Sequence, residues 1–237
     1  MRSSVVVFPG SNCDRDVEKA LLYMETGPVD MVWHDEAAFP HRPDLVVLPG
    51  GFAYGDYLRS GALAAKSRIM DAVRAHAEEG GLVLGICNGF QILTEAGLLP
   101  GALLPNASLR FICRPSYLRV ENADTPFTCS FAGREIVQFP IAHHEGLYYL
   151  PDDELDRLER SGRVVFRYAD QESGEAGEDY SPNGSLRGIA GIINDRGNVL
   201  GLMPHPERAT VQGLIWGMDG KGVWRSLGEH FGAWEGK

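Results

Sequence analysis

The sequence predicts an α/β protein with a doubly wound, mostly parallel sheet, and three observations support this fold class. The first half of the chain alternates short apolar runs with segments of helical periodicity. The apolar runs are continuous, which is typical of strands in a parallel sheet that is covered on both faces. From about Tyr117 the apolar runs follow one another with short connections, which predicts antiparallel strands added to the sheet edge. Because connections between parallel strands are almost always right-handed, a doubly wound sheet is the expected arrangement.

Each element of the first half has its own signal. Strands are expected over four apolar runs, at residues 5–8, 29–33, 45–48 and 82–86. A helix is expected at 14–24, where Val17, Ala20 and Leu21 recur on one helical face, and a long helix at 62–77. A third helical pattern begins at Gln91, directly after the fourth strand.

The second half predicts further strands and one domain. Strands are expected at residues 117–120, 136–141, 164–168, 189–193 and 199–202, with a hairpin turn at 194–198. Residues 152–160 predict a short charged helix, and the acidic, Gly- and Ser-rich residues 171–185 predict a mobile surface loop. The aromatic tail from Leu214 predicts a C-terminal helix packed on the sheet. With no repeat and no linker, residues 1–237 are expected to form a single domain.

Composition excludes several classes of protein. A net charge of -10 argues against nucleic acid as a partner, because phosphate binding needs a basic face. No apolar run is long enough for a signal peptide or a membrane span, so a cytoplasmic protein without a membrane partner is expected. The four cysteines form no CxxC pair and predict reduced thiols, with neither a disulfide framework nor a metal site: they are Cys13, Cys87, Cys113 and Cys129.

The strongest chemical signal is the cysteine that ends the fourth strand. Cys87 lies between Gly85 and Gly89, and a helical pattern follows it. This strand–nucleophile–helix layout matches the nucleophile elbow, in which a sharp turn presents the side chain at the top of the sheet. The positive end of the helix dipole favours the thiolate there. The alternative is a free cysteine buried as a small hydrophobic residue.

A candidate general base follows another strand. His205 comes after the run 199–202 and lies between two prolines, and Glu207 is two residues further on. The carboxylate can orient the imidazole and stabilise its protonated form, as the third member of a triad does. An ordinary loop histidine is the alternative. Donors for an oxyanion are expected from the backbone N–H groups of Asn88, after the nucleophile, and Gly51, after the third strand.

Three longer stretches carry a resemblance to a known family. They run from Phe8 to Asp14, from Pro49 to Arg59 and from Met203 to Ala209. Together with the elbow they resemble class I, or triad, glutamine amidotransferases, and in particular the glutaminase subunits of phosphoribosylformylglycinamidine synthase in purine biosynthesis. The resemblance covers residues 5 to about 210. It implies a flavodoxin-like class I amidotransferase fold with antiparallel strands added in the second half.

The resemblance also implies roles. Cys87 would attack the side-chain amide of L-glutamine and form a γ-glutamyl thioester, His205 would move the protons, and Glu207 would orient the imidazole. The glutamine pocket would be lined by Gly50, Phe52, Gln91, Asn106, Ser108, Arg110 and Phe111. Ammonia would pass to a larger ATP-dependent synthetase subunit, joined by a small third subunit. The chain itself would need no cofactor, since ATP and Mg²⁺ belong to the partner.

One stretch departs from the family pattern. His143-His144-Glu145-Gly146 stands where the family has His-Gly-Glu-Gly, so His144 replaces a glycine. If the backbone there needs a positive φ, the histidine costs about 1 kcal/mol or more. These residues are expected to face the synthetase and the ammonia exit. A metal site built from them is disfavoured, because neighbours on a strand point to opposite faces.

Two other functions compete with this interpretation. A cysteine hydrolase of the DJ-1/PfpI type shares the sheet and the elbow cysteine, but it normally has a histidine close after that cysteine. Here Asn88 follows, and the next histidine is His143. A non-catalytic subunit that keeps the fold is expected to lose Cys87, His205 or Glu207, and all three are present.

Overall fold

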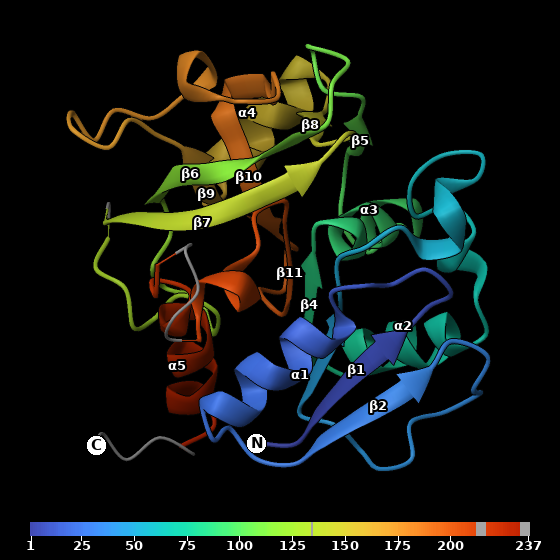
Figure 1. The fold of residues 1–237 in the computed structure, drawn as a ribbon. Helices are drawn as coiled ribbons and strands as arrows, with labels where there is room; N and C mark the ends of the chain where they lie inside the picture. The colour runs from blue at the N-terminus through green and yellow to red at the C-terminus, as the bar shows by residue number, and fades with distance from the viewer. Residues whose placement is uncertain (134, 212–216, 233–237) are drawn as a thin grey trace.

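The computed structural model describes residues 1–133, 135–211 and 217–232, and it contains one large sheet (Figure 1). The strands of the first half are β1 (Ser3–Val7), β2 (Val29–Trp33), β3 (Leu45–Leu48), β4 (Leu82–Ile86) and β5 (Ala102–Leu104). Those of the second half are β6 (Ile112–Val120), β7 (Ile136–His143), β8 (Leu147–Tyr149), β9 (Val164–Tyr168), β10 (Ile189–Ile193) and β11 (Val199–Leu202). The helices are α1 (Asp14–Tyr23), α2 (Ile69–Glu78), α3 (Asn88–Glu95), α4 (Asp152–Arg160) and α5 (Lys221–His230).

The sheet joins the two halves of the chain. Its nine strands run in the order β2-β1-β3-β4-β11-β10-β9-β6-β7. The pairs from β2 to β11 are parallel, and those from β11 to β7 are antiparallel. Figure 1 shows β1 and β2 at one end of the molecule and β6 and β7 at the other. The predicted fold class is therefore confirmed, and the second half returns β11 to the parallel region beside β4.

Apolar runs explain why the central strands lie where they do. Every residue of β3, β4 and β11 is buried. Around them α2 packs against β4, while α3 packs against β3, β4 and β11. A continuous core runs from Val5 in β1 to Leu227 in α5. Burial of both sheet faces is the reason why these strands lack the alternation of a half-exposed sheet.

Three expectations need correction. The long helix predicted at 62–77 is two helices, Ala64–Lys66 and α2, because Ser67 between them is extended (ψ 149°) and its hydroxyl bonds Tyr54 at 2.9 Å. The region 171–185 is a surface loop only in its first part, since Asn183 and Ser185 are buried. Finally, no strands were predicted at β5 and β8, which pair as a separate two-stranded sheet.

A C-terminal helix was expected in the tail that begins at Leu214, and the structure has a shorter one, α5 (Lys221–His230). Trp224 of α5 is buried, and its indole N–H donates to Thr210 at 2.8 Å. The helix packs against a short 3-10 helix, Pro206–Ala209, that follows β11. Trp216 and Trp234 lie outside the described residues. No described helix has the length and apolar character that a membrane crossing requires.

Candidate active site

Strand register brings the motifs to one edge of the sheet. Leu202 of β11 lies opposite Ile86 of β4, so Cys87 and the segment that leads to His205 leave the sheet side by side. The Cys87 N–H donates to the Leu202 carbonyl at 2.8 Å. Gly85 lies opposite Leu48 at the end of β3, directly before Gly50 and Gly51. The edge formed by the carboxyl ends of parallel strands is where open α/β sheets bind their ligands.

Cys87 forms the turn that an elbow requires. Its φ is 51° and its ψ is −105°, a conformation that is costly for a residue with a side chain. A Cβ at Gly89 would lie 1.9 Å from the Leu48 carbonyl oxygen, and one at Gly85 would lie 2.4 Å from Leu93. Close packing around the turn therefore requires both glycines. The Cys87 side chain is 4% exposed and opens α3, as the elbow pattern predicts.

His205 and Glu207 form a buried pair. Nδ1 of His205 lies 2.6 Å from Oε1 of Glu207, and each residue is 1% exposed. Burial by itself would lower the pKa of His205. The negative charges of Glu207 and Cys87 outweigh that effect and raise the pKa of His205 well above its usual value. Among the described residues, Nε2 of His205 and Oε2 of Glu207 have no hydrogen-bond partner. An imidazole held in this way can take up and release a proton at Nε2.

Gly50 supports the imidazole. A Cβ at Gly50 would lie 2.8 Å from Cε1 of His205 and 3.2 Å from the sulfur of Cys13. Gly50, which was predicted to line the glutamine pocket, is not among the residues that line the cavity beside Cys87. Cys13 was not among the predicted site residues. It follows β1, and the end of a parallel strand was the signal that could have identified it.

The two predicted oxyanion donors lie next to the cysteine. Gly51 has a φ of 137°, where a Cβ would lie 2.7 Å from the backbone nitrogen of Asn12. Asn88 is the first residue of α3. The N–H groups in the first turn of a helix have no acceptor within the helix, and the N–H of Asn88 is one of them. The Asn88 side chain accepts a hydrogen bond from the Ala53 N–H at 3.1 Å. This bond fixes the loop after β3 to the elbow.

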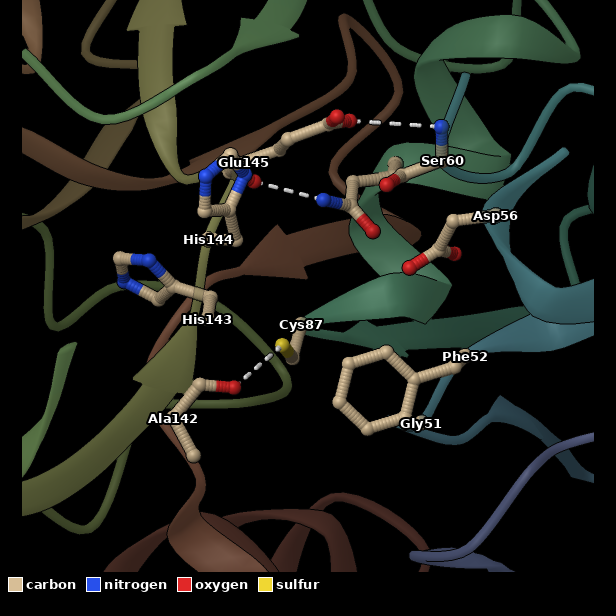
Figure 2. Close-up of a pocket in the computed structure, with 10 residues that line it drawn as sticks. Gly51, Phe52, Asp56, Ser60, Cys87, Ala142, His143, His144 and Glu145 are labelled. Carbon is tan, nitrogen blue, oxygen red and sulfur yellow. Dashed lines mark hydrogen bonds between the residues drawn. The ribbon is translucent and has the colours of Figure 1, made fainter. Parts of the chain in front are cut away.

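Cys87 faces a cavity of about 230 Å³ (Figure 2). The wall is made by the end of β7, the loop after β3 and the start of α3. Its lining residues are Gly51, Phe52, Asp56, Ser60, Cys87, Gln91, Ala142, His143, His144 and Glu145. Phe52 and Gln91, two of the residues predicted for the glutamine pocket, are among them. The Gln91 amide donates to the Glu145 carbonyl at 2.6 Å, which joins α3 to the end of β7.

Two carboxylates share this cavity. Burial, and then the negative charge of Glu145, raise the pKa of Asp56 to about 6. Glu145 in turn accepts a hydrogen bond from the Ser60 N–H at 3.3 Å. Sequence reasoning did not select Asp56, although it lies within the family-like stretch after β3. The cavity therefore has a negative region next to the thiol.

The predicted pocket residues after β5 lie behind the wall of this cavity or at the surface. Asn106 is fully buried, and its amide donates to the carbonyls of Arg110 and His143 at 2.8 and 3.0 Å. Ser108 and Arg110 are exposed. The ring of Phe111 lies 6.4 Å from that of Phe52, which does line the cavity. None of these four residues lines the cavity as described. Asn106 instead anchors the connection between β7 and β8.

His143 is a buried structural residue. Its Nδ1 lies 3.1 Å from Oδ1 of Asn106, and its Nε2 lies 3.4 Å from the amide of Asn183. Burial, and then the charge of His205, lower the pKa of His143 to about 3, so the imidazole is neutral. In the view of Figure 2 its ring points away from Cys87. His143 was predicted to face the synthetase and the ammonia exit; in the structure it lines the cavity with both ring nitrogens bonded inside the protein.

His144 and Glu145 have different surroundings. His144 is exposed, and its φ is not positive, so the expected strain of a histidine in place of the family's glycine is absent. Because the His143 ring is held by Asn106 and Asn183, a metal site of His143, His144 and Glu145 does not form. Among the described residues, the cluster with metal-ligand geometry is Cys13, His205 and Glu207.

Comparisons with known proteins agree with this geometry. Residues 1–226 match the family described as CobB/CobQ-like glutamine amidotransferase domain. The chain is 53% identical over 230 residues to the phosphoribosylformylglycinamidine synthase subunit PurQ of Rhodopseudomonas palustris, covering 97% of this chain and 98% of the relative. It is 52% identical to the PurQ subunit of Rhodospirillum rubrum, with coverage of 97% and 99%.

Solved structures show the same similarity. A chain from the structure of PurLQS from Thermotoga maritima has a TM-score of 0.84 and 47% identity, and the match covers 97% of this chain and 98% of that one. The glutaminase domain of CTPS from Trypanosoma brucei has a TM-score of 0.60 at 13% identity over 98% and 94% of the two chains, which supports the fold alone. The chain belongs to the CobB/CobQ-like glutamine amidotransferase family and, within it, to the PurQ subunits of phosphoribosylformylglycinamidine synthase.

Proposed function

We propose that this chain is the glutaminase component of phosphoribosylformylglycinamidine synthase. It hydrolyses L-glutamine and delivers ammonia for the conversion of formylglycinamide ribonucleotide to formylglycinamidine ribonucleotide. The observation that carries the proposal is the elbow cysteine beside a buried His–Glu pair whose Nε2 has no partner among the described residues. The names of relatives that match nearly the whole chain give the reaction.

The reaction begins with attack by sulfur. The Cys87 thiolate adds to the side-chain amide carbon of glutamine, and the carbonyl oxygen takes the negative charge. The N–H groups of Gly51 and Asn88 can donate to that oxygen. Protonated His205 gives its proton to the amide nitrogen, the C–N bond breaks, and ammonia leaves a γ-glutamyl thioester on Cys87. The raised pKa of His205 suits it to hold this proton until the transfer.

Hydrolysis then regenerates the cysteine. Neutral His205 takes a proton from water while the water oxygen attacks the thioester carbon. When the C–S bond breaks, glutamate is released and the thiolate and imidazolium are restored. Glu207 stabilises the imidazolium in both steps and keeps Nε2 directed at the reacting atoms. Glu207 therefore acts through the histidine and has no direct contact with the substrate.

Asp56 and Glu145 supply a position for the α-ammonium group of glutamine. Both line the cavity that contains Cys87. A substrate cation between them would offset the burial and the negative charge of Glu145, which together raise the pKa of Asp56 to about 6. Gln91 and Phe52 complete the wall. The expected contribution of Asn106, Ser108, Arg110 and Phe111 requires them to approach the cavity when glutamine binds. Asn106 already bonds His143, and Phe111 lies beside Phe52, and both of these partners line the cavity.

The ammonia is used by partner subunits. We assign ATP and Mg²⁺ to a larger synthetase subunit, we expect a small third subunit in the complex, and the reaction is placed in the cytoplasm. The support is the word "subunit" in the relatives' names and the PurLQS assembly to which the similar Thermotoga chain belongs. Within residues 143–146, His144 is the exposed residue, and it lies at the rim of the cavity. We therefore propose that His144 contacts the synthetase subunit.

A DJ-1/PfpI-like hydrolase fits the site less well. In that class the histidine follows the cysteine closely, whereas here Asn88 occupies that place and its side chain is bonded to Ala53. The histidine of this site comes from the end of β11. The arrangement therefore favours the amidotransferase.

The test measures ammonia release from glutamine by the chain alone, and then with the purine-pathway synthetase, ATP and formylglycinamide ribonucleotide. We expect strong stimulation in the mixture and a loss of at least about 10³-fold in the Cys87→Ala variant. Cys113→Ala, an exposed cysteine, is the matched control. Activity retained by Cys87→Ala would overturn the mechanism, and equal rates with and without the synthetase would overturn the proposed partnership.

A further inference from the structure

A second thiol lies beside the catalytic pair. The sulfur of Cys13, an imidazole nitrogen of His205 and a carboxylate oxygen of Glu207 all lie within 4.8 Å of one another. The three side chains are buried, at 2%, 1% and 1% exposure. Cys13 directly precedes α1, and His205 and Glu207 follow β11, so the fold brings together residues that are 192 positions apart in the chain, Cys13 and His205. The proposed glutaminase mechanism does not use Cys13.

The cluster contains polar atoms without partners. Among the described residues, neither Oε2 of Glu207 nor Nε2 of His205 has a hydrogen-bond partner. A buried carboxylate oxygen without a partner is costly, and it gains from any ligand that supplies positive charge. Oε2 of Glu207 is therefore available as a ligand atom, in a cluster whose distances are already short.

We propose that Cys13, His205 and Glu207 form a site for zinc, in which the ion inhibits the enzyme reversibly. Sulfur, imidazole nitrogen and carboxylate oxygen are the three ligand types that Zn²⁺ prefers. A tetrahedral zinc site places its ligands roughly 3–4 Å apart, given bond lengths of about 2.0–2.3 Å. Small side-chain movements from the present arrangement are enough, with water as the fourth ligand. Mg²⁺ and Ca²⁺ prefer sites built from oxygen and do not match this set.

The charges around the cluster set the strength of binding. On binding, the Cys13 thiol and the protonated His205 ring each give a proton to solvent, and the Cys13 thiolate together with the Glu207 carboxylate neutralises the ion. Arg208 opposes the ion, because its guanidinium lies 3.0 Å from the Cys13 sulfur. That guanidinium also lies 3.4 Å from Asp16, which compensates part of its charge. We therefore expect an exchangeable site, weaker than a structural zinc site.

Occupation of the site would stop the reaction. The ion would hold His205 and Glu207, the residues that move and stabilise the proton. Glutamine could still reach Cys87 in the cavity, but the His205 imidazole could no longer exchange protons with the glutamine. The zinc site uses two residues of the proposed mechanism, yet metal binding can be measured without glutamine turnover, so the two proposals fail separately.

Cobalt titration tests the site directly. Co²⁺ replaces Zn²⁺ in such sites, and its absorption shows both tetrahedral geometry and a bond to thiolate sulfur. The titration uses the full-length Cys87→Ala protein, so that the nucleophile cannot be the ligand. We expect a thiolate-to-cobalt band that Zn²⁺ displaces. Adding Cys13→Ala to this background should remove the band, whereas adding Cys113→Ala, an exposed cysteine, should leave it unchanged. No band in the Cys87→Ala protein, or a band that survives Cys13→Ala, would overturn the proposal.

A second set of variants covers the case in which Cys13→Ala does not fold. Cys13→Ser keeps the size of the side chain and replaces the sulfur, so it should lose the band and bind Zn²⁺ at least tenfold more weakly by calorimetry. Glu207→Gln should weaken Zn²⁺ binding as well, because it removes a charge from the cluster. Unchanged zinc affinity in both variants would show that the ion binds elsewhere.

Discussion

Two buried histidines flank Cys87 in opposite states. His143, at the end of β7, has both ring nitrogens held by asparagines and is neutral, with a pKa lowered to about 3. His205, after β11, is paired with Glu207 through one nitrogen and has a raised pKa, while its other nitrogen has no partner among the described residues. Both side chains are at least 97% buried, since their exposed fractions are 3% and 1%.

The difference shows that partners, and not burial, decide what a buried histidine does. Burial favours the neutral ring at both positions, and amide partners of no net charge leave that preference in place at His143. A carboxylate reverses the preference at His205. One histidine therefore stabilises the wall of the cavity, and the other keeps a proton available for chemistry. Exchanging the roles should be impossible without exchanging the partners.

The largest effect should come from removing the functional histidine. His205→Asn is expected to lower the rate of ammonia release by at least about 10³-fold, because no group remains to protonate the leaving nitrogen. Its free energy of unfolding should fall by roughly 3–5 kcal/mol, because the buried Glu207 carboxylate loses the imidazole that lies 2.6 Å away. Steady-state kinetics and urea unfolding of the same preparation check both statements. A rate within tenfold of the wild type would remove His205 from the mechanism.

The two histidines should also affect stability with opposite dependence on pH. At His143 the folded pKa lies below the unfolded value of 6.5, so its contribution to stability is present above pH 6.5 and is lost as the pH falls toward about 3. This loss amounts to roughly 2–5 kcal/mol. At His205 the folded pKa is raised, so its contribution is present below pH 6.5 and is lost as the pH rises through the folded pKa.

Urea unfolding of the wild type, His143→Asn and His205→Asn across this pH range measures the difference. Comparison with the wild type is needed because Asp56, with a raised pKa of about 6, acts in the opposite direction to His143 between pH 3.8 and 6. In a plot of the free energy of unfolding against pH, we expect His143→Asn to flatten the acid side only and His205→Asn to flatten the alkaline side only. If both variants changed the same side, the assigned charge states would be wrong.

The structural histidine should mainly affect stability. His143→Ala leaves Asn106 and Asn183 with fewer partners and opens a cavity, so the free energy of unfolding should fall by roughly 1–3 kcal/mol. Its neighbour His144 is exposed, and His144→Ala should change stability by no more than about 0.5 kcal/mol. Chemical denaturation gives both values. A large loss of activity in His143→Ala at unchanged stability would contradict the separation of roles.

The smallest effect is expected at Asp56, the carboxylate proposed to bind the α-ammonium group of the substrate. Asp56→Asn should raise the KM for glutamine about tenfold and change kcat less, because it removes one negative charge from the α-ammonium position. In the wild type KM should rise as the pH falls below about 6, where Asp56 becomes protonated, and this dependence should be weaker in Asp56→Asn. Asp152→Asn, at an exposed position, is the control. An unchanged KM would place the α-ammonium group elsewhere.

Local patterns were enough to predict much of the fold. β2, β3, β4, β9, β10, β11 and α4 have the predicted bounds, because each is a single apolar run or an amphipathic segment with clear ends. The prediction was wrong where one long-range contact decided the backbone. Ser67 splits the expected helix through its bond to Tyr54, and β5 and β8 are too short to form without each other.

The candidate site shows the same division. The spacing of Cys87, Asn88, His205 and Glu207 defined an elbow and a His–Glu pair, and strand register then placed them together. The sequence could not show that Asn106 and His143 bond each other inside the protein, 37 residues apart. It also could not give the distances that bring Cys13 to His205 and Asp56 into the cavity beside Cys87.

The sequence alone thus determined the elements, the elbow and the chemical types of the triad, because turns, periodicity and neighbouring side chains are properties of short segments. The tertiary structure decided which histidine carries charge, which asparagine is buried and which second thiol lies beside the pair. Those outcomes depend on distances between segments that meet only when the strands pair in the order of the sheet. A pKa in particular follows from the charges and solvent that surround a group in space.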